Sequence, residues 1–273
     1  MTTLELRLAP RPKYYVLALA AVQRAITYRG NLLLNLLSGL VWVAMLYYLW
    51  RAVYSTRAQL GGFDWGQMRT YILISYAVNA LLSFSSLSRI LASIRTGEIA
   101  TELLRPIDYL WAQLAQTAGT AVVEGLLSSV IALALGFLLL DVAPPVSLPA
   151  ALLFLLSVGL GFLIKFLISF LVALLCFWTL NGLGLIWAQT ALISLFSGAL
   201  IPLQLMPGWL RTIALAAPFQ AIVYTPLTIY LGTTQGAALW WALGLQVFWV
   251  AALWALARLL WAPAARALEL QGG

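Results

Sequence analysis

Long apolar runs constrain this chain more than any other feature of the sequence. A helix needs about 20 apolar residues to cross a bilayer, and that length applied along the chain gives six spans. Only 8% of the residues are charged, whereas a soluble domain carries about a quarter. The sequence therefore predicts an all-α membrane protein with no room for a sizeable soluble domain. The expected spans are residues 32–50, 71–87, 114–140, 148–178, 185–200 and 239–260.

The segments outside the spans suggest three regions along the chain. Residues 1–30 are basic, and Tyr15, Leu19, Val22 and Ile26 share one helical face, so we expect an interfacial N-terminal helix. A short soluble helix or a disordered arm is the alternative. Residues 31–262 would form a single transmembrane domain, and residues 263–273 a cytoplasmic tail.

The stretch between the last two spans is apolar but broken by prolines. Residues 202–232 carry a single charge, Arg211, and no straight helix can cross so many prolines. Irregular backbone survives at membrane depth only where protein buries it or where it lines a cavity. We expect a re-entrant helical hairpin that acts as an outer gate. The candidate gate residues are Gly198, Pro202, Pro207, Arg211 and Pro218.

The distribution of basic residues predicts the orientation. With six spans both termini share a side, and that side carries ten Lys and Arg residues against four on the other. The positive-inside rule then places both termini in the cytoplasm. The charged loop 89–111 would be cytoplasmic, and the proline-rich stretch would open to the outside. The net charge of +7 points to anionic lipid headgroups rather than to nucleic acid.

The cytoplasmic loop contains a short amphipathic segment that ends at an Arg-Pro pair. A helix held at the membrane face with exposed leucines suits a cytoplasmic partner, but a solvated connector explains the same pattern. Both readings stay open on the residues alone. The candidate docking residues are Gly97, Glu98, Glu102, Leu103, Leu104, Arg105 and Pro106.

Charges inside the spans mark candidate pathway residues, because they are costly in lipid. Lys165 lies about 25 Å below the outer face and Glu124 about 15 Å above the inner face, so both fall in the inner half of the bilayer. They form a buried pair, or Lys165 reaches the cytoplasmic headgroups instead. Asn79 is a third candidate, in a serine-rich span. We expect the main cargo site between spans one, two and five.

The residue types present argue against chemistry in this chain. Histidine is absent, and Cys176 is the only cysteine, so no catalytic residue and no metal site is expected. No phosphate-binding G-x-x-x-x-G-K-[ST] motif occurs, because Lys13 and Lys165 are followed by Tyr14 and Phe166. The chain is not expected to be an enzyme or to bind a cofactor.

Two motifs resemble the type-two ABC exporter permease family. One is G-E-I-x-x-E-L-L-R-P at residues 97–106, which is similar to an uncharacterised bacterial branch of that family. The other combines Ser197-Gly198, Ile201-Pro202, Pro207, Trp209 and Pro218-Phe219 between spans five and six.

The resemblance implies an assembly that the residues alone do not show. Two six-helix subunits would pair, as identical or paralogous chains, above two cytoplasmic ABC ATPase subunits that bind ATP and Mg. Residues 97–106 would form the coupling helix, the N-terminal helix the connecting helix, and residues 202–232 the re-entrant helices. The protein would lie in a bacterial cytoplasmic membrane.

The resulting interpretation is a permease subunit that exports an amphipathic or hydrophobic substrate, such as a drug-like molecule, a lipid or a peptide. ATP hydrolysis on a separate subunit would drive the transport. The alternative is a proton-coupled secondary transporter that uses Glu124 as its carrier. A membrane enzyme is the third possibility, disfavoured because no paired intramembrane carboxylates occur.

Overall fold

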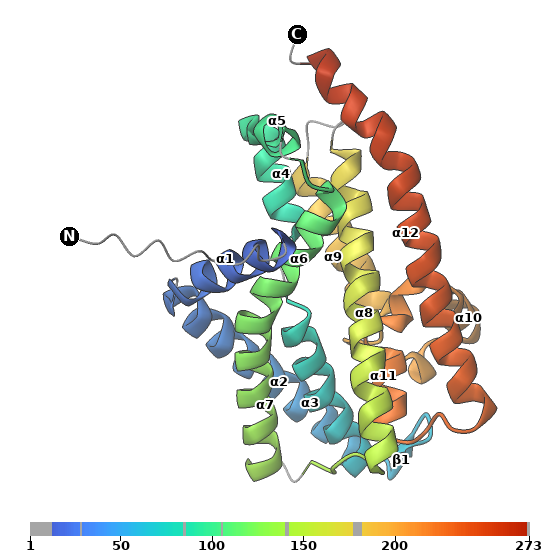
Figure 1. Ribbon diagram of the computed structural model, residues 1–273. Helices are drawn as coiled ribbons and strands as arrows, with labels where there is room; N and C mark the ends of the chain where they lie inside the picture. Colours follow the sequence, from blue (N-terminus) through green and yellow to red (C-terminus); the bar gives the residue numbers. More distant parts are fainter. Residues whose placement is uncertain are drawn as a thin grey trace.

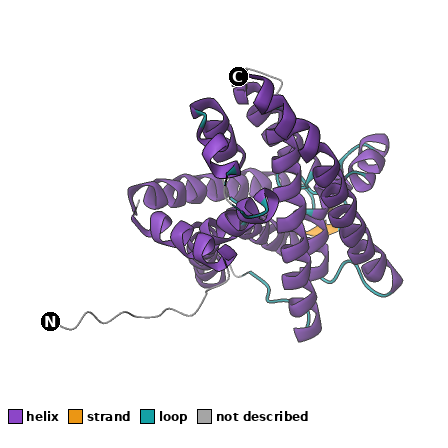
Figure 2. Cartoon of the chain, turned by 45° about the horizontal axis from the view of Figure 1, so that its top comes forward, coloured by secondary structure: helices purple, strands orange, loops and turns teal. Residues whose placement is uncertain are grey.

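The computed structural model describes residues 13–27, 29–83, 86–104, 106–139, 142–176 and 182–271. Side chains lie outside that description at residues 24–27, 29–33, 35–36, 95, 100, 103, 124, 135, 138–139 and 262–271. The described chain is almost entirely helical, and its single short β-hairpin is the orange segment in Figure 2.

The first half of the chain forms two long helices, a small hairpin and a set of shorter helices. Helix α1 lies across α6 (Figure 1). The elements are α1 (Lys13–Thr27), α2 (Arg29–Tyr54), β1 (Gln59–Leu60), β2 (Phe63–Asp64), α3 (Trp65–Leu81), α4 (Ser86–Thr96), α5 (Glu98–Leu103), α6 (Tyr109–Thr120), the π-helix η1 (Ala121–Gly125) and α7 (Leu126–Leu139).

The second half places a group of short helices between long ones. Helix α5 and the C-terminal end of α12 lie at one end of the molecule, and the β-hairpin lies at the opposite end (Figure 1). The elements are α8 (Leu148–Leu175), α9 (Gly182–Phe196), the 3-10 helix η2 (Leu203–Leu205), α10 (Gly208–Ala216), the 3-10 helix η3 (Pro218–Ala221), α11 (Tyr224–Tyr230) and α12 (Ala237–Gln271).

Five helical stretches of the described chain are long and apolar enough to cross a membrane. The apolar helix Gly182–Phe196 is shorter, and it falls where the sequence predicts the fifth of six spans. The five candidates are Leu37–Tyr54, Trp65–Ile94, Tyr109–Ala134, Leu148–Leu175 and Ala237–Trp261.

Helix α8 forms the centre of the hydrophobic core. It packs against α12, α11 and α4, and Phe166, Leu167 and Phe170 on it are fully buried. The helix begins at Ser147, whose side chain accepts a hydrogen bond from the Ala150 backbone N–H, and a proline follows in the first turn. Burial of large apolar side chains therefore holds these three helices against α8.

Helical structure extends into segments that the sequence predicts as a loop and a tail. The loop expected from residue 89 begins as a helix, because Leu87, Ile90 and Leu91 form an apolar stripe on α4 and are buried. The tail expected from residue 263 continues α12 to Gln271, in agreement with its many alanine and leucine residues. Helix α2 begins at Arg29, inside the expected N-terminal segment 1–30.

Candidate functional site

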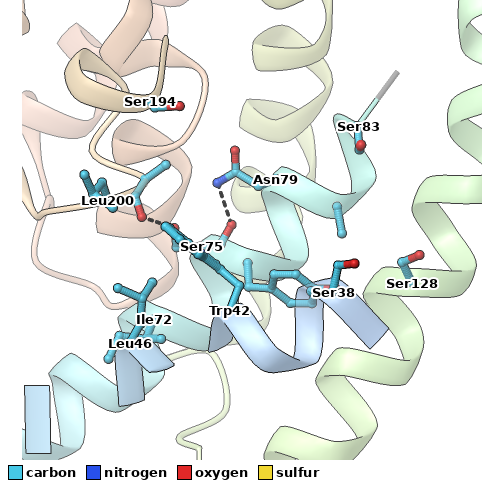
Figure 3. Close-up of a pocket in the computed structure, with 14 residues that line it drawn as sticks. Ser38, Trp42, Leu46, Ile72, Ser75, Asn79, Ser83, Ser128, Ser194 and Leu200 are labelled. Carbon is cyan, nitrogen blue, oxygen red and sulfur yellow. Dashed lines mark hydrogen bonds between the residues drawn. The ribbon is translucent and has the colours of Figure 1, made fainter. Parts of the chain in front are cut away.

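A polar cavity of about 410 Å³ lies between α2, α3, α7, α9 and the turn that follows α9. Seven of its fourteen lining residues carry a hydroxyl or an amide, and Figure 3 shows most of them around Trp42, Leu46 and Ile72. The seven are Ser38, Ser75, Tyr76, Asn79, Ser83, Ser128 and Ser194.

A second cavity, of about 330 Å³, lies between α3, α4, α8 and α9. It shares Asn79, Ser83 and Ser194 with the first cavity, so the two cavities are adjacent. Lys165 and Gln189 line only the second. Together the cavities place a polar space among helices from spans one, two, three, four and five of the predicted arrangement.

Lys165 contacts the point where span two is interrupted. Its Nζ donates a hydrogen bond to the Leu82 carbonyl O, 2.6 Å away, directly after the last residue of α3. A cation at the C-terminal end of a helix also interacts favourably with the helix dipole. This hydrogen bond therefore connects α8 to the end of α3, beside the second cavity.

The π-helix η1 contacts the same end of α3. A Cβ atom added at Gly125 would lie 2.6 Å from the Leu81 carbonyl O, so any side chain here would require the backbone of α3 to shift. One turn further on, the Ser129 hydroxyl donates to the Ala77 carbonyl at 2.6 Å. An interruption of α-helical geometry in span three thus packs against the interruption in span two.

Helix α5 occupies one end of the molecule and begins at a left-handed glycine. Gly97 has φ +75°, a conformation that glycine adopts at little cost. Glu98 and Leu104 are exposed, and 85% of the Leu104 surface is open to solvent. An apolar side chain at such exposure on a short helix is a candidate contact for a partner.

Side-chain hydrogen bonds join α5 to α6 and α4. The Gln113 Nε2 donates to Glu102 Oε2 at 3.4 Å. Arg89 Nη2 donates to Gln113 Oε1 at 3.3 Å and to Thr117 Oγ1 at 3.0 Å. These contacts connect α5, α6 and α4, and Leu87 and Ser88 of α4 line the second cavity.

The loop after α5 is held by both ends of the chain. Lys13 Nζ donates to the Pro106 carbonyl O at 3.3 Å, and the Asp108 backbone N–H donates to Tyr14 Oη at 3.3 Å. Asp108 also forms an ion pair with Arg258 on α12 and caps α6 by accepting from the Trp111 N–H at 3.0 Å. Helices α1 and α12 therefore anchor this loop.

Two opposing effects set the pKa of the Asp108 carboxyl. Partial burial raises the pKa, but hydrogen bonds from Arg258 and from the backbone N–H of Trp111 and Leu110, together with the Arg258 charge, lower it by more. The net pKa lies below the ordinary value of 3.8. Asp108 is therefore ionised at neutral pH and keeps its partner on α12.

Near the opposite end, α3 holds the turn that follows α9. Gly198 has φ +80°, and its carbonyl O accepts from the Tyr71 hydroxyl at 2.6 Å. The Ser75 hydroxyl donates to the Ala199 carbonyl at 3.2 Å. Since Ser75 also lines the first cavity, this turn forms part of the cavity wall.

The second half of the proline-rich segment is buried by the surrounding helices, whereas most of α10 is exposed. Six consecutive residues of α11, from Thr225 to Tyr230, are buried. The fully buried Gln246 on α12 donates to the carbonyl oxygens of Ala221 and Ser157 at 2.7 and 3.1 Å, and its own Oε1 accepts from the Ser157 hydroxyl at 2.9 Å. The irregular backbone therefore has protein partners on two sides.

The predicted pathway, coupling and gate residues differ in where the structure places them. Asn79 and Lys165 line the cavities, whereas the side chains of Leu103 and Glu124 and all of Arg105 lie outside the described residues. The structure therefore describes Lys165 but not the side chain of Glu124, and their pairing stays a prediction. Of the gate candidates, Pro202 and Gly198 are buried, Pro218 is half-buried, and Pro207 and Arg211 are exposed.

The sequence reasoning did not single out Gln189 or Ser194, which line the cavities from α9. The sequence gives little indication of their role, because a glutamine and a serine in an apolar helix occur in ordinary helix–helix contacts as well as in transport pathways. Span two is serine-rich in the sequence, and its Ser75 and Ser83 line the first cavity.

These features define a multi-pass helical membrane protein with a polar cavity inside the helical bundle and an exposed helix at one end. The sequence pattern of ABC-2 family transporter proteins matches residues 40–272, which is most of the chain. The chain therefore belongs to the ABC-2 transporter family, a membrane component of ABC transporters, and this membership implies association with ABC ATPase subunits. No curated protein matches the chain.

Proposed function

We propose that the chain is a permease subunit that exports an amphipathic or hydrophobic substrate, driven by ATP hydrolysis on a separate cytoplasmic subunit. The observation that carries this proposal is the connection from the exposed helix α5 to the cavity. Helix α5 contacts Gln113 through Glu102, Gln113 contacts Arg89 on α4, and Leu87 on α4 lines the second cavity.

In this proposal α5 is the coupling helix, and the ATPase contacts it at Glu98, Leu103 and Leu104. ATP-driven movement of the ATPase would displace α5 and, through α4, the end of α3 at Leu82. The cavity would then open alternately to the two sides of the membrane. ATP and Mg would be bound by the partner.

The proposed topology has six spans, with Gly182–Phe196 as the fifth and both termini in the cytoplasm. The Asp108–Arg258 ion pair supports it, because that pair joins the loop after α5 to the C-terminal half of α12. We further propose that α1 lies at the cytoplasmic interface. Its Tyr15 and Val16 side chains are exposed and apolar, as required for contact with lipid.

The segment from η2 to α11 is the proposed re-entrant outer gate. It is broken by prolines, its helix α11 is buried in the fold, and the Tyr71 hydroxyl donates to Gly198 in the turn that precedes it. We also propose that a second permease subunit, identical or paralogous, completes the pathway. The cytoplasmic membrane of a bacterium is the proposed location.

The alternative of a proton-coupled carrier depends on Glu124. Its side chain lies outside the described residues, and membership of the ABC-2 family favours an ATPase partner instead.

Leu104→Ser tests the coupling surface. We expect the variant to retain less of the ATPase during purification from native membranes, because an exposed leucine in an interface contributes about 1–3 kcal/mol. Leu148→Ser is the matched control, since Leu148 is 74% exposed at the start of α8, away from the proposed interface. Equal retention of the ATPase by both variants would remove α5 from the interface.

A further inference from the structure

The lining of the two cavities carries many hydroxyl and amide groups and few charged side chains. No Asp or Glu occurs among the described lining residues of either cavity. Lys165 is the one basic side chain among them, and its Nζ donates to the Leu82 carbonyl. A cationic cargo would find no carboxylate among these residues, and an anionic cargo would find no cation in the first cavity.

Several polar side chains in the lining donate their hydrogen bonds to backbone carbonyl groups. The Ser38 hydroxyl donates to the Leu34 carbonyl at 2.7 Å and the Ser75 hydroxyl to the Ala199 carbonyl at 3.2 Å. In Figure 3 the Asn79 nitrogen points to the Ser75 carbonyl, 2.9 Å away, and its oxygen points in the other direction. These groups therefore offer lone pairs, rather than protons, to a molecule in the cavity.

Gln189 provides a second and independent indication of an acceptor site. Its side-chain amide is fixed by a hydrogen bond from Nε2 to Ser169 Oγ at 2.7 Å. Its Oε1 is buried and has no hydrogen-bond partner among the described residues, and only 8% of Gln189 is exposed. A buried acceptor without a donor costs free energy, and a ligand that supplies an N–H or O–H group removes that cost.

We propose that the cavities bind a neutral amphiphile that carries several hydrogen-bond donors, such as a hydroxylated headgroup on an apolar body. The donors would meet Gln189 Oε1 and Asn79 Oδ1, while the apolar part would contact Trp42, Leu46 and Ile72. The inference rests on the proposed function, because it identifies the class of cargo for the same cavity. It narrows the expected amphipathic or hydrophobic substrates to uncharged molecules with donor groups.

Four octyl probes of equal chain length test the inference on the full-length chain in lipid nanodiscs. They are octyl glucoside, its permethylated analogue, octyl sulfate and octylammonium, and each competes with radiolabelled octyl glucoside. We expect octyl glucoside to bind at least about tenfold more tightly than the other three, since each loses donors or adds a charge. Equal binding of the permethylated analogue, or tighter binding of an ionic probe, would overturn the inference.

Gln189 variants identify the acceptor. Gln189→Met conserves volume and should weaken octyl glucoside binding about tenfold, whereas Gln235→Met, at an exposed loop position, should leave binding unchanged. Gln189→Glu should shift the preference toward octylammonium, a result that a purely structural glutamine would not give. Unchanged selectivity in both Gln189 variants would refute the assignment.

The binding assay needs no ATPase, so the two proposals fail separately. Absence of a co-purifying ATPase would refute the proposed function while the probe selectivity stands. Loss of probe selectivity in a chain that retains its ATPase would refute the cargo class alone.

Discussion

Gly125→Ala tests whether the π-helix η1 and the end of α3 pack as closely as the structure shows. The new Cβ would lie 2.6 Å from the Leu81 carbonyl O, 2.7 Å from its Cα and 2.9 Å from its carbonyl C. Carbon atoms in contact prefer about 3.5 Å, so the backbone of α3 would have to move by roughly 0.8 Å. Overpacking of this kind costs about 1–3 kcal/mol.

The gain in helix propensity opposes that cost. Replacing glycine with alanine in a helix contributes up to about 1 kcal/mol, so we expect Gly125→Ala to destabilise the protein by about 1–2 kcal/mol. Gly159→Ala on α8 is the matched control, because nothing lies within 4 Å of its added Cβ, and it should be neutral or slightly stabilising.

Thermal unfolding of both variants in one detergent measures the difference. A change of 1 kcal/mol corresponds to about 2–4 °C in Tm for a chain of this size class, so Gly125→Ala should melt about 2–8 °C below the parent protein. A Gly125→Ala protein that is as stable as Gly159→Ala would contradict the close contact between η1 and α3.

Two further variants test the contacts around the cavity and the coupling end. Asp108→Asn keeps the cap of α6 but removes the ion pair with Arg258. Because the pKa of Asp108 is lowered in the fold, its stabilisation is present above about pH 4 and lost as the pH falls through the folded pKa. An acid titration of unfolding should therefore show a steeper loss below about pH 4 in the parent than in the variant, and parallel curves would contradict the ion pair. Lys165→Met removes the donor to the Leu82 carbonyl. It should destabilise the protein by about 1–3 kcal/mol and accelerate amide exchange in the last turn of α3, and unchanged exchange would contradict the role of Lys165.

Elements with a clear local signal were predictable from the sequence. The apolar run before Leu175 appears as α8, and the glycine at residue 97 as a left-handed turn ahead of α5. The prolines after residue 200 correspond to short helices and turns, as expected where no straight helix can form. Membership of the ABC-2 family confirms the resemblance of the two motifs.

Features that depend on long-range packing were not predictable. At the break of span two, the Leu82 carbonyl accepts a hydrogen bond from Lys165 of a distant helix, and the π-helix at Ala121–Gly125 has no known sequence signal in this chain. Ser86–Thr96 reads as a charged loop by composition, but its apolar stripe packs on α8 and makes it a helix. Composition alone therefore does not reveal this helix.

The cavity lining shows the same limit. Asn79 stands out because it is polar in an apolar span, but Gln189 gains its meaning only from its neighbours in space. In the structure Gln189 Nε2 donates to Ser169 Oγ, and Gln189 Oε1 is left without a hydrogen-bond partner among the described residues. A sequence shows which polar residues a span contains, whereas the packing decides which of their atoms lack a partner.

The most direct test of the account is ATP-dependent transport by this chain with the ATPase that co-purifies from its native membrane. The complex in sealed vesicles should move a neutral octyl glycoside across the bilayer only when ATP is hydrolysed, and Leu104→Ser should weaken that coupling while Leu148→Ser does not. Transport by the purified chain without any ATPase, or the absence of a co-purifying ATPase, would contradict the account.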